Sequence, residues 1–117
     1  MTDTHQVCAR FHRAIELIGT RWSGAILRAL GTGHHRYVHI KAAVPGLSDT
    51  MLATRLRSLE EDGLIERMVL TNPPGSVEYH LTRMGSELEP VLDAIIAWSH
   101  TWLTTGADEP CTAEDRT

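Results

Sequence analysis

The chain has 117 residues, of which 42% are hydrophobic and 22% charged, enough for one globular domain with a modest core. Its formal net charge of −4 argues against indiscriminate binding to nucleic acid, and two cysteines are too few for a disulfide scaffold or a Cys-x-x-Cys zinc site. No apolar run approaches the roughly 18 residues that span a bilayer, and residues 1–6 do not resemble a signal peptide. We therefore expect a cytoplasmic protein that does not contact the membrane.

Two amphipathic helices are expected first. Apolar residues recur at spacings of three and four from Val7 to Ile18, and Gly19 should end this helix. A second apolar set runs from Trp22 to Leu30 and stops at the Gly-Thr-Gly of residues 31–33.

A short helix and a tight turn should follow. Residues 34–38 are compatible with a small strand that leads into a helix. Residues 40–44 then indicate a short helical stretch, which Pro45 and Gly46 break.

The next helix carries clear signals at both ends. Ser48 is a good N-cap, and Asp49 is well placed for the positive end of the helix. Gly63 should act as its C-cap. The apolar stripe between these ends consists of Leu52, Leu56 and Leu59.

The remaining elements are a hairpin and a long helix. Residues 64–71 and 77–81 are predicted to be antiparallel strands, joined by a turn-rich loop at residues 72–76. Thr82 should cap a long final helix in which Pro90 causes a kink or a restart. The residues of this helix expected to face inward are Leu88, Val91, Leu92, Ile95, Trp98 and Trp102.

The charge is distributed unevenly. Residues 104–117 hold four acidic side chains against one basic, so we expect the domain to span residues 1–103 and to be followed by an acidic, disordered tail. Residues 34–57 hold four basic side chains against one acidic. A local basic face on a near-neutral body is typical of a specific DNA-binding protein, although a solvated surface has the same pattern.

The order of elements is that of a winged helix-turn-helix, a mainly α fold with a small β-hairpin wing. The helix after the tight turn would lie in a major groove, and the hairpin would reach the adjacent backbone. Thr50 and Thr54 are expected to read bases, while Arg55 and Arg57 suit either bases or phosphates. An exposed helix that merely needs polar residues is the alternative. The expected DNA-binding residues on this helix are Ser48, Asp49, Thr50, Thr54, Arg55 and Arg57.

Several stretches, in this order and spacing, resemble the HxlR family of winged helix-turn-helix regulators, which are relatives of the MarR group. The resemblance covers nearly the whole chain, from Cys8 to Trp98. It rests on Cys8-Ala9-Arg10, residues 17–22 (LIGTRW), residues 27–30 (LRAL), residues 45–48 (PGLS), residues 52–65 (LATRLRSLEEDGLI) and residues 77–85 (VEYHLTRMG).

The resemblance implies a homodimer joined through the first and last helices, with double-stranded DNA as its partner and one recognition helix per half of an inverted repeat. Trp98 and Trp102 would then lie in the dimer interface rather than in an intramolecular core. Three positions depart from the family pattern: Ala9 replaces a frequent Pro, Tyr37 replaces a frequent Phe, and Gly75-Ser76 replaces a basic wing residue. Arg67 is a weaker candidate for the wing contact.

The resemblance also implies a sensor. In some family members a cysteine at the start of the first helix responds to oxidants, quinones or other electrophiles, and Cys8 matches that position. Cys111 would be within reach as a resolving thiol. Alternatively, Cys8 is a small buried apolar residue.

Other functions compete with this hypothesis. A small-molecule effector would need an apolar pocket, for which Phe11, Trp22, Trp98 and Trp102 are candidates, although all four also suit a core. An enzyme is disfavoured because the chain lacks a phosphate loop and a nucleophile elbow, and no cofactor is expected. His34, His35 and His39 lack partners at ligand spacing, so no metal is expected. A winged protein-interaction module without DNA binding remains possible.

Overall fold

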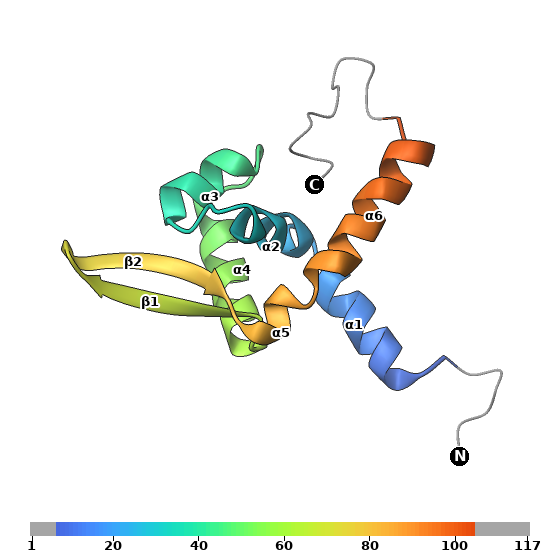
Figure 1. Ribbon diagram of the computed structural model, residues 1–117, viewed down its shortest axis with the longest axis horizontal. Coiled ribbons are helices and arrows are strands. Elements are labelled where there is room, and N and C mark those ends of the chain that lie inside the picture. Colours follow the sequence, from blue (N-terminus) through green and yellow to red (C-terminus); the bar gives the residue numbers. More distant parts are fainter. Residues whose placement is uncertain (1–6, 105–117) are drawn as a thin grey trace.

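The computed structural model describes residues 7–104, which form six helices and one two-stranded antiparallel sheet (Figure 1). In chain order the elements are α1 (Ala9–Gly19), α2 (Ser23–Gly31), α3 (Tyr37–Ala43), α4 (Asp49–Glu61), β1 (Ile65–Thr71), β2 (Pro74–Leu81), α5 (Arg83–Ser86) and α6 (Glu89–Trp102). This order confirms the predicted mainly helical fold with a hairpin wing. None of the helices within residues 7–104 is long and apolar enough to cross a membrane.

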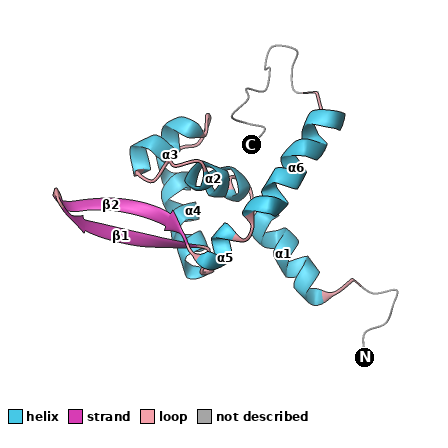
Figure 2. Ribbon diagram, in the orientation of Figure 1, coloured by secondary structure: helices cyan, strands magenta, loops and turns pink. Residues whose placement is uncertain are grey.

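Helices α2, α3 and α4 form a central helical body. The wing, made of β1 and β2, leaves this body on one side, and α1 and α6 extend from the opposite side as two arms (Figures 1 and 2). An ion pair of 2.7 Å between Arg28 Nη1 on α2 and Asp93 Oδ1 on α6 fastens the α6 arm to the body.

The core lies between the three body helices and the base of the wing. Each buried aliphatic side chain of this kind contributes roughly 1.5–3 kcal/mol to folding. The core residues are Ile26, Leu27, Ala29, Leu30, Ile40, Val44, Leu47, Leu52, Leu56, Leu59, Leu64, Ile65 and Leu92.

Helix α4 begins and ends as predicted. Ser48 is its N-cap, and the Ser48 hydroxyl accepts a hydrogen bond of 3.1 Å from the backbone N–H of Met51. Just beyond its end, Gly63 has a φ of +82°, in the left-handed region that glycine adopts without strain. The three leucines of the predicted stripe are buried, so the opposite face of α4 is turned to solvent.

The corner between α1 and α2 has an unusual backbone. Trp22 precedes α2 with a φ of 76°, which is a rare left-handed conformation for a large side chain. Such a residue costs on the order of 1–3 kcal/mol and persists only where its surroundings hold it in place.

The expectation of a small strand at residues 34–38 is wrong, because α3 already begins at Tyr37. The segment nevertheless contacts the wing: the backbone N–H of Tyr79 on β2 donates a hydrogen bond of 2.8 Å to the carbonyl oxygen of His35. A single backbone hydrogen bond of this kind is not enough to define a third strand.

The wing is longer than the sequence indicates. Strand β2 starts at Pro74, within the predicted loop of residues 72–76, and Pro74 pairs with Thr71 of β1. The register shifts between Val69 and Thr71, so the hairpin is irregular near its tip.

The predicted final helix is divided in two. Thr82 is a cap, but of the four-residue α5, where its hydroxyl accepts a hydrogen bond of 3.2 Å from the N–H of Gly85. The chain then restarts as α6 with Pro90 in its first turn, which confirms the interruption predicted from this proline.

The expectation that the apolar face of this last helix points inward is correct only near its start. Leu92 is buried, and Leu88 packs against the core. The rest of the face is exposed because α6 runs away from the body (Figure 1). Its exposed members are Val91, Ile95, Trp98 and Trp102, of which Trp102 is 71% exposed.

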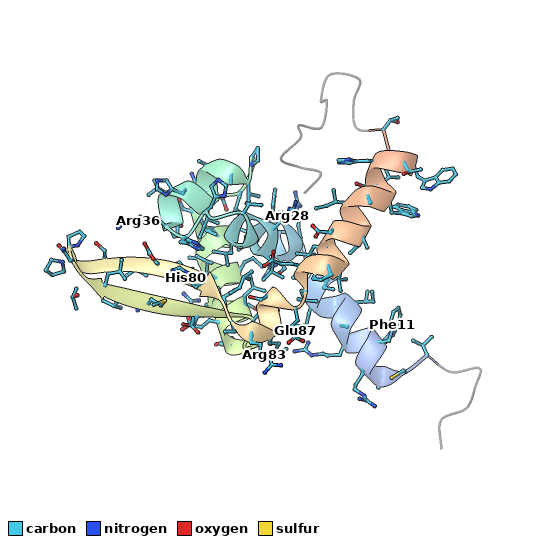
Figure 3. All side chains as sticks on the ribbon, in the orientation of Figure 1. Phe11, Arg28, Arg36, His80, Arg83 and Glu87 are labelled. Carbon is cyan, nitrogen blue, oxygen red and sulfur yellow. The ribbon has the colours of Figure 1, made fainter. Side chains whose placement is uncertain are left out.

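Helix α1 also has an apolar face that a single chain does not cover. None of its residues is buried, and Phe11 and Ile15 are 57% and 52% exposed. Figure 3 shows Phe11 on this arm, on the side of the molecule away from the wing. Both arms therefore present exposed apolar surface, which is typical of an interaction site.

Gly85 is predicted to be intolerant of any side chain. A Cβ at this position would collide with the carbonyl oxygen of Leu64, where neither backbone can easily give way. We expect Gly85→Ala to lower the free energy of unfolding by about 2 kcal/mol or more.

The matched control is Gly24→Ala in α2, where the new Cβ would lie at an ordinary 3.5 Å from the carbonyl oxygen of Ile18 and should be neutral or slightly stabilising. Chemical unfolding at one fixed protein concentration measures both. Equal stability of the two variants would contradict the packing described here.

Candidate DNA-binding interface

Helices α3 and α4 meet across the turn at residues 44–48, and α4 presents its polar face to solvent. Two contacts fix the start of α4 against α3. The Tyr37 hydroxyl donates to the carbonyl oxygen of Asp49 at 3.0 Å, with the Asp49 carboxylate at 3.3 Å. Lys41 Nζ lies 3.7 Å from the same carboxylate. The Asp49 side chain is therefore already engaged within the protein.

Tyr37 is one of the positions singled out in the sequence analysis. Desolvation raises the pKa of the Tyr37 hydroxyl, and the negative charge of Asp49 adds to the effect. The hydroxyl therefore stays protonated at neutral pH and serves as a hydrogen-bond donor. A phenylalanine could not make this bond to Asp49.

Three of the predicted contact residues form one exposed strip on α4. Thr50, Thr54 and Arg57 are all exposed to solvent. The Thr54 hydroxyl donates to the carbonyl oxygen of Thr50 at 2.9 Å, which leaves its methyl group and oxygen lone pair for a partner. Arg57 has no hydrogen bond or ion pair to any other residue in the described part of the chain.

Arg55 lies apart from this strip and is half-buried. Its Nε donates a hydrogen bond of 2.8 Å to the carbonyl oxygen of Arg21, in the corner between α1 and α2. The structure therefore gives Arg55 an internal contact that the sequence did not indicate, since 34 residues separate the two partners.

The wing carries one of the predicted residues. Arg67 is exposed on β1, opposite Tyr79 in the register of the hairpin. The tip, residues 72–76, contains no basic side chain. A contact between a basic side chain of the hairpin and a phosphate would therefore have to come from the strands rather than from the tip.

Sequence reasoning missed a polar cluster that joins the wing to the segment before α3. The rings of His35 and His80 stack with centroids 4.0 Å apart. His80 Nε2 lies 2.8 Å from Glu78 Oε1, and the other Glu78 oxygen lies 3.9 Å from Arg36 Nε. Figure 3 labels Arg36 and His80 where the wing approaches the helical body.

The partners of Glu78 stabilise its charged form. The hydrogen bond with His80 is the main cause that lowers the pKa of Glu78, and the positive charge of Arg36 lowers it further. The cluster is a structural brace of the wing. No sequence pattern marks it, since its members come from separate segments.

Cys8 occupies the N-cap position of α1 and is exposed, so it is not a buried core thiol in the single chain. The backbone N–H groups of Phe11 and Arg10 lower the pKa of the Cys8 thiol, and the Arg10 side chain contributes further. A larger thiolate fraction makes this sulfur more reactive towards electrophiles. Cys111, the predicted resolving thiol, lies outside the described residues.

The four aromatic residues proposed for a ligand pocket are not brought together. Phe11, Trp98 and Trp102 are exposed on the arms, whereas Trp22 packs against the core. A pocket of about 250 Å³ instead lies between the end of α2, the base of the wing and the start of α6, with Glu89 in its lining. Within residues 7–104 no group of three or more histidine, cysteine or acidic side chains is arranged to hold a metal ion.

Known proteins share this sequence over most of its length. The profile of the family described as HxlR-like helix-turn-helix matches residues 17–107. The HTH-type transcriptional regulator YodB of Bacillus subtilis is 36% identical over 108 residues, which cover 92% of this chain and 96% of YodB. YvaP of the same species, an uncharacterized HTH-type transcriptional regulator, is 37% identical over 98 residues, or 84% of this chain and 91% of YvaP.

Solved structures agree with the sequence comparisons. The reduced form of YodB superposes with a TM-score of 0.74 at 36% identity, covering 86% of this chain and 99% of that chain. The redox regulator HypR in its oxidized form superposes with a TM-score of 0.75 at 30% identity, covering 83% of this chain and 100% of that chain. These relatives are transcription regulators and not enzymes. The chain therefore belongs to the HxlR-like helix-turn-helix family and is a transcriptional regulator of the helix-turn-helix type.

Proposed function

We propose that this regulator is a homodimer that binds an inverted repeat in double-stranded DNA and places one α4 in the major groove of each half-site. The observation that carries the proposal is the two-faced character of α4. Its leucine stripe is buried, while Thr50, Thr54 and Arg57 stand free on the opposite face. A helix of this kind that follows a tight turn is what major-groove recognition requires.

Each residue of this face has a proposed role. The methyl groups of Thr50 and Thr54 suit contact with thymine, and the Arg57 guanidinium suits a guanine edge or a phosphate. Ser48 and Asp49 are proposed to act by fixing the start of the helix, because their side chains already bind Met51 and Tyr37. Arg67 on β1 is the proposed backbone contact of the wing.

The arms are the proposed dimer interface. Residues of α1 and α6 such as Phe11, Ile15 and Ile95 are apolar and exposed, and Trp98 is 57% exposed. Two copies that pair these arms around a two-fold axis would bury this surface and present two α4 helices on one side of the dimer. The domain is proposed to end near residue 103.

Cys8 is the proposed sensor of electrophiles. Two structures of one relative are described as diamide-treated YodB and quinone-bound YodB, and the lowered pKa of Cys8 favours the same chemistry here. Its thiolate sulfur would add to a quinone ring carbon to form an S–C bond. The hydrogen of that carbon would move to one ring oxygen, and the other ring oxygen would take up the proton that the thiol had released to solvent, which gives a hydroquinone thioether. An adduct at the start of α1 would displace one arm against its partner and change the spacing of the two α4 helices.

Removal of Arg57 is predicted to weaken specific DNA binding. We expect Arg57→Ala to cost about 1–3 kcal/mol if the side chain reads a base, whereas loss of a phosphate contact would reduce the salt slope by roughly 0.9. The measurement is fluorescence anisotropy with DNA from upstream of the protein's own gene, or with DNA selected from a random pool, in the presence of competitor.

Glu61→Ala at the end of α4 is the control. It removes an exposed, negatively charged side chain, so it should not weaken the affinity for the chosen DNA site. If Arg57→Ala left specific binding unchanged, this face of α4 would not be the surface that recognises DNA. Failure of the wild-type protein to select any sequence would favour a protein-interaction module.

Exposure to a quinone or to diamide is predicted to release the DNA through Cys8. Wild-type protein should bind tightly in reductant and lose at least about tenfold in affinity after treatment, whereas Cys8→Ser should bind equally before and after. Cys111→Ser tests separately whether the second thiol takes part. A response that persists in Cys8→Ser would refute the proposed sensor and leave the DNA-binding proposal intact.

A further inference from the structure

The hydrogen bond between Arg55 and Arg21 links two parts of the fold that the chain separates by 34 residues. Arg55 lies on α4, and the carbonyl oxygen of Arg21 lies in the corner where α1 turns into α2. The N···O distance of 2.8 Å is short for a bond from a guanidinium, and such charge-assisted bonds are stronger than neutral ones.

The corner that accepts this bond is held in an unfavourable conformation. Trp22, the next residue, has a left-handed φ of 76°. The Arg21 guanidinium lies over the Trp22 ring, 4.9 Å from its centroid. Local strain of this kind persists only where surrounding contacts over-determine it.

The Trp22 ring also lies near the turn that leads into α4. Gly46 in that turn has a φ of +87°, and a Cβ built there would lie 3.5 Å from the tip of the Trp22 indole. The corner is therefore bonded to α4 through Arg55, and Trp22 lies near the turn before α4. A second tie joins α1 to the end of α4, where Arg13 Nη2 lies 3.3 Å from Asp62 Oδ1, but this exposed pair contributes little.

We propose that Arg55 is a positioning residue, which sets the orientation of α4 by anchoring it to the Arg21–Trp22 corner rather than by reading DNA. This replaces the expectation from sequence that Arg55 contacts bases or phosphates. Because α1 ends at this corner, a displacement of the α1 arm would also be transmitted to α4 through this hydrogen bond. This consequence rests on the proposed function.

The chemistry of the bond makes a lysine an informative substitution. The donor is the Nε of the guanidinium, which lysine lacks, although lysine keeps the positive charge. Lysine has a methylene group in the place of Nε and its ammonium one atom further out. A phosphate contact would therefore largely survive Arg55→Lys, whereas the bond to the Arg21 carbonyl would be weakened in Arg55→Lys and lost in Arg55→Ala. Arg57→Lys and Arg57→Ala are matched controls two residues further along α4.

The test consists of one measurement without DNA and one with DNA. Without DNA, hydrogen–deuterium exchange of residues 20–24 should accelerate by about tenfold in Arg55→Ala, by less in Arg55→Lys, and stay unchanged in both Arg57 variants. With DNA, Arg55→Ala should lose about tenfold in affinity with an unchanged salt slope, and Arg55→Lys should lose less. Arg57→Ala should lower the affinity, and it should lower the salt slope as well if Arg57 contacts a phosphate.

Unchanged exchange in both Arg55 variants would overturn the proposal, whatever the DNA measurement gives. It would also be overturned if Arg55→Ala lowered the salt slope, since that result indicates a phosphate contact. Failure of the wild-type protein to bind DNA would refute the proposed function. It would not refute the role of Arg55 in positioning α4, because the hydrogen–deuterium exchange measurement tests that role independently.

Discussion

Burial of the leucine stripe of α4 is the constraint on which the rest of the structure depends. Leu52, Leu56 and Leu59 are all inaccessible to water, and they pack with aliphatic side chains of α2 and α3 and of the wing base. Loss of one such side chain from a packed core typically costs 2–5 kcal/mol, so rotation of α4 about its axis is strongly opposed. Because the stripe points inward, the face with Thr50, Thr54 and Arg57 has to point outward.

Polar contacts then define where α4 begins and how it is tilted. The Ser48 cap and the bond from Tyr37 to Asp49 hold its first turn, and the bond from Arg55 to Arg21 holds its middle. The Ser48 bond stays within α4, whereas the other two join α4 to α3 and to the corner between α1 and α2. The exposed face of α4 is thus positioned by side chains that do not themselves belong to it.

The features that follow from local periodicity and capping were predictable from the sequence. The stripe, the Ser48 cap and the turn at Gly63 depend on residues within one helix, and the structure confirms them. The apolar face of α6 was predicted to point inward, but most of it is exposed. The prediction failed because periodicity shows that a helix face is apolar but does not show what covers that face. The resemblance to the family correctly indicated the fold.

Contacts between distant segments could not be predicted in this way. The stack of His35 on His80 and the bond from Arg55 to Arg21 depend on three-dimensional placement, and no spacing in the sequence marks them. The intolerance of Gly85 has the same origin, since the obstacle is the backbone at Leu64. For α4, the sequence predicted which face is exposed to solvent and placed Arg55 at the flank of that face, but it did not indicate that Arg55 binds Arg21.

The central claim is that two copies, paired through α1 and α6, present two α4 helices to DNA. The most direct measurement is a hydroxyl-radical footprint of the protein on a site selected from random DNA. The account predicts two symmetry-related protected half-sites, with centres separated by roughly 34–36 Å or a multiple of it, that are lost together in a Trp98→Ala and Trp102→Ala double variant. A single asymmetric footprint that survives in this variant would contradict the claim.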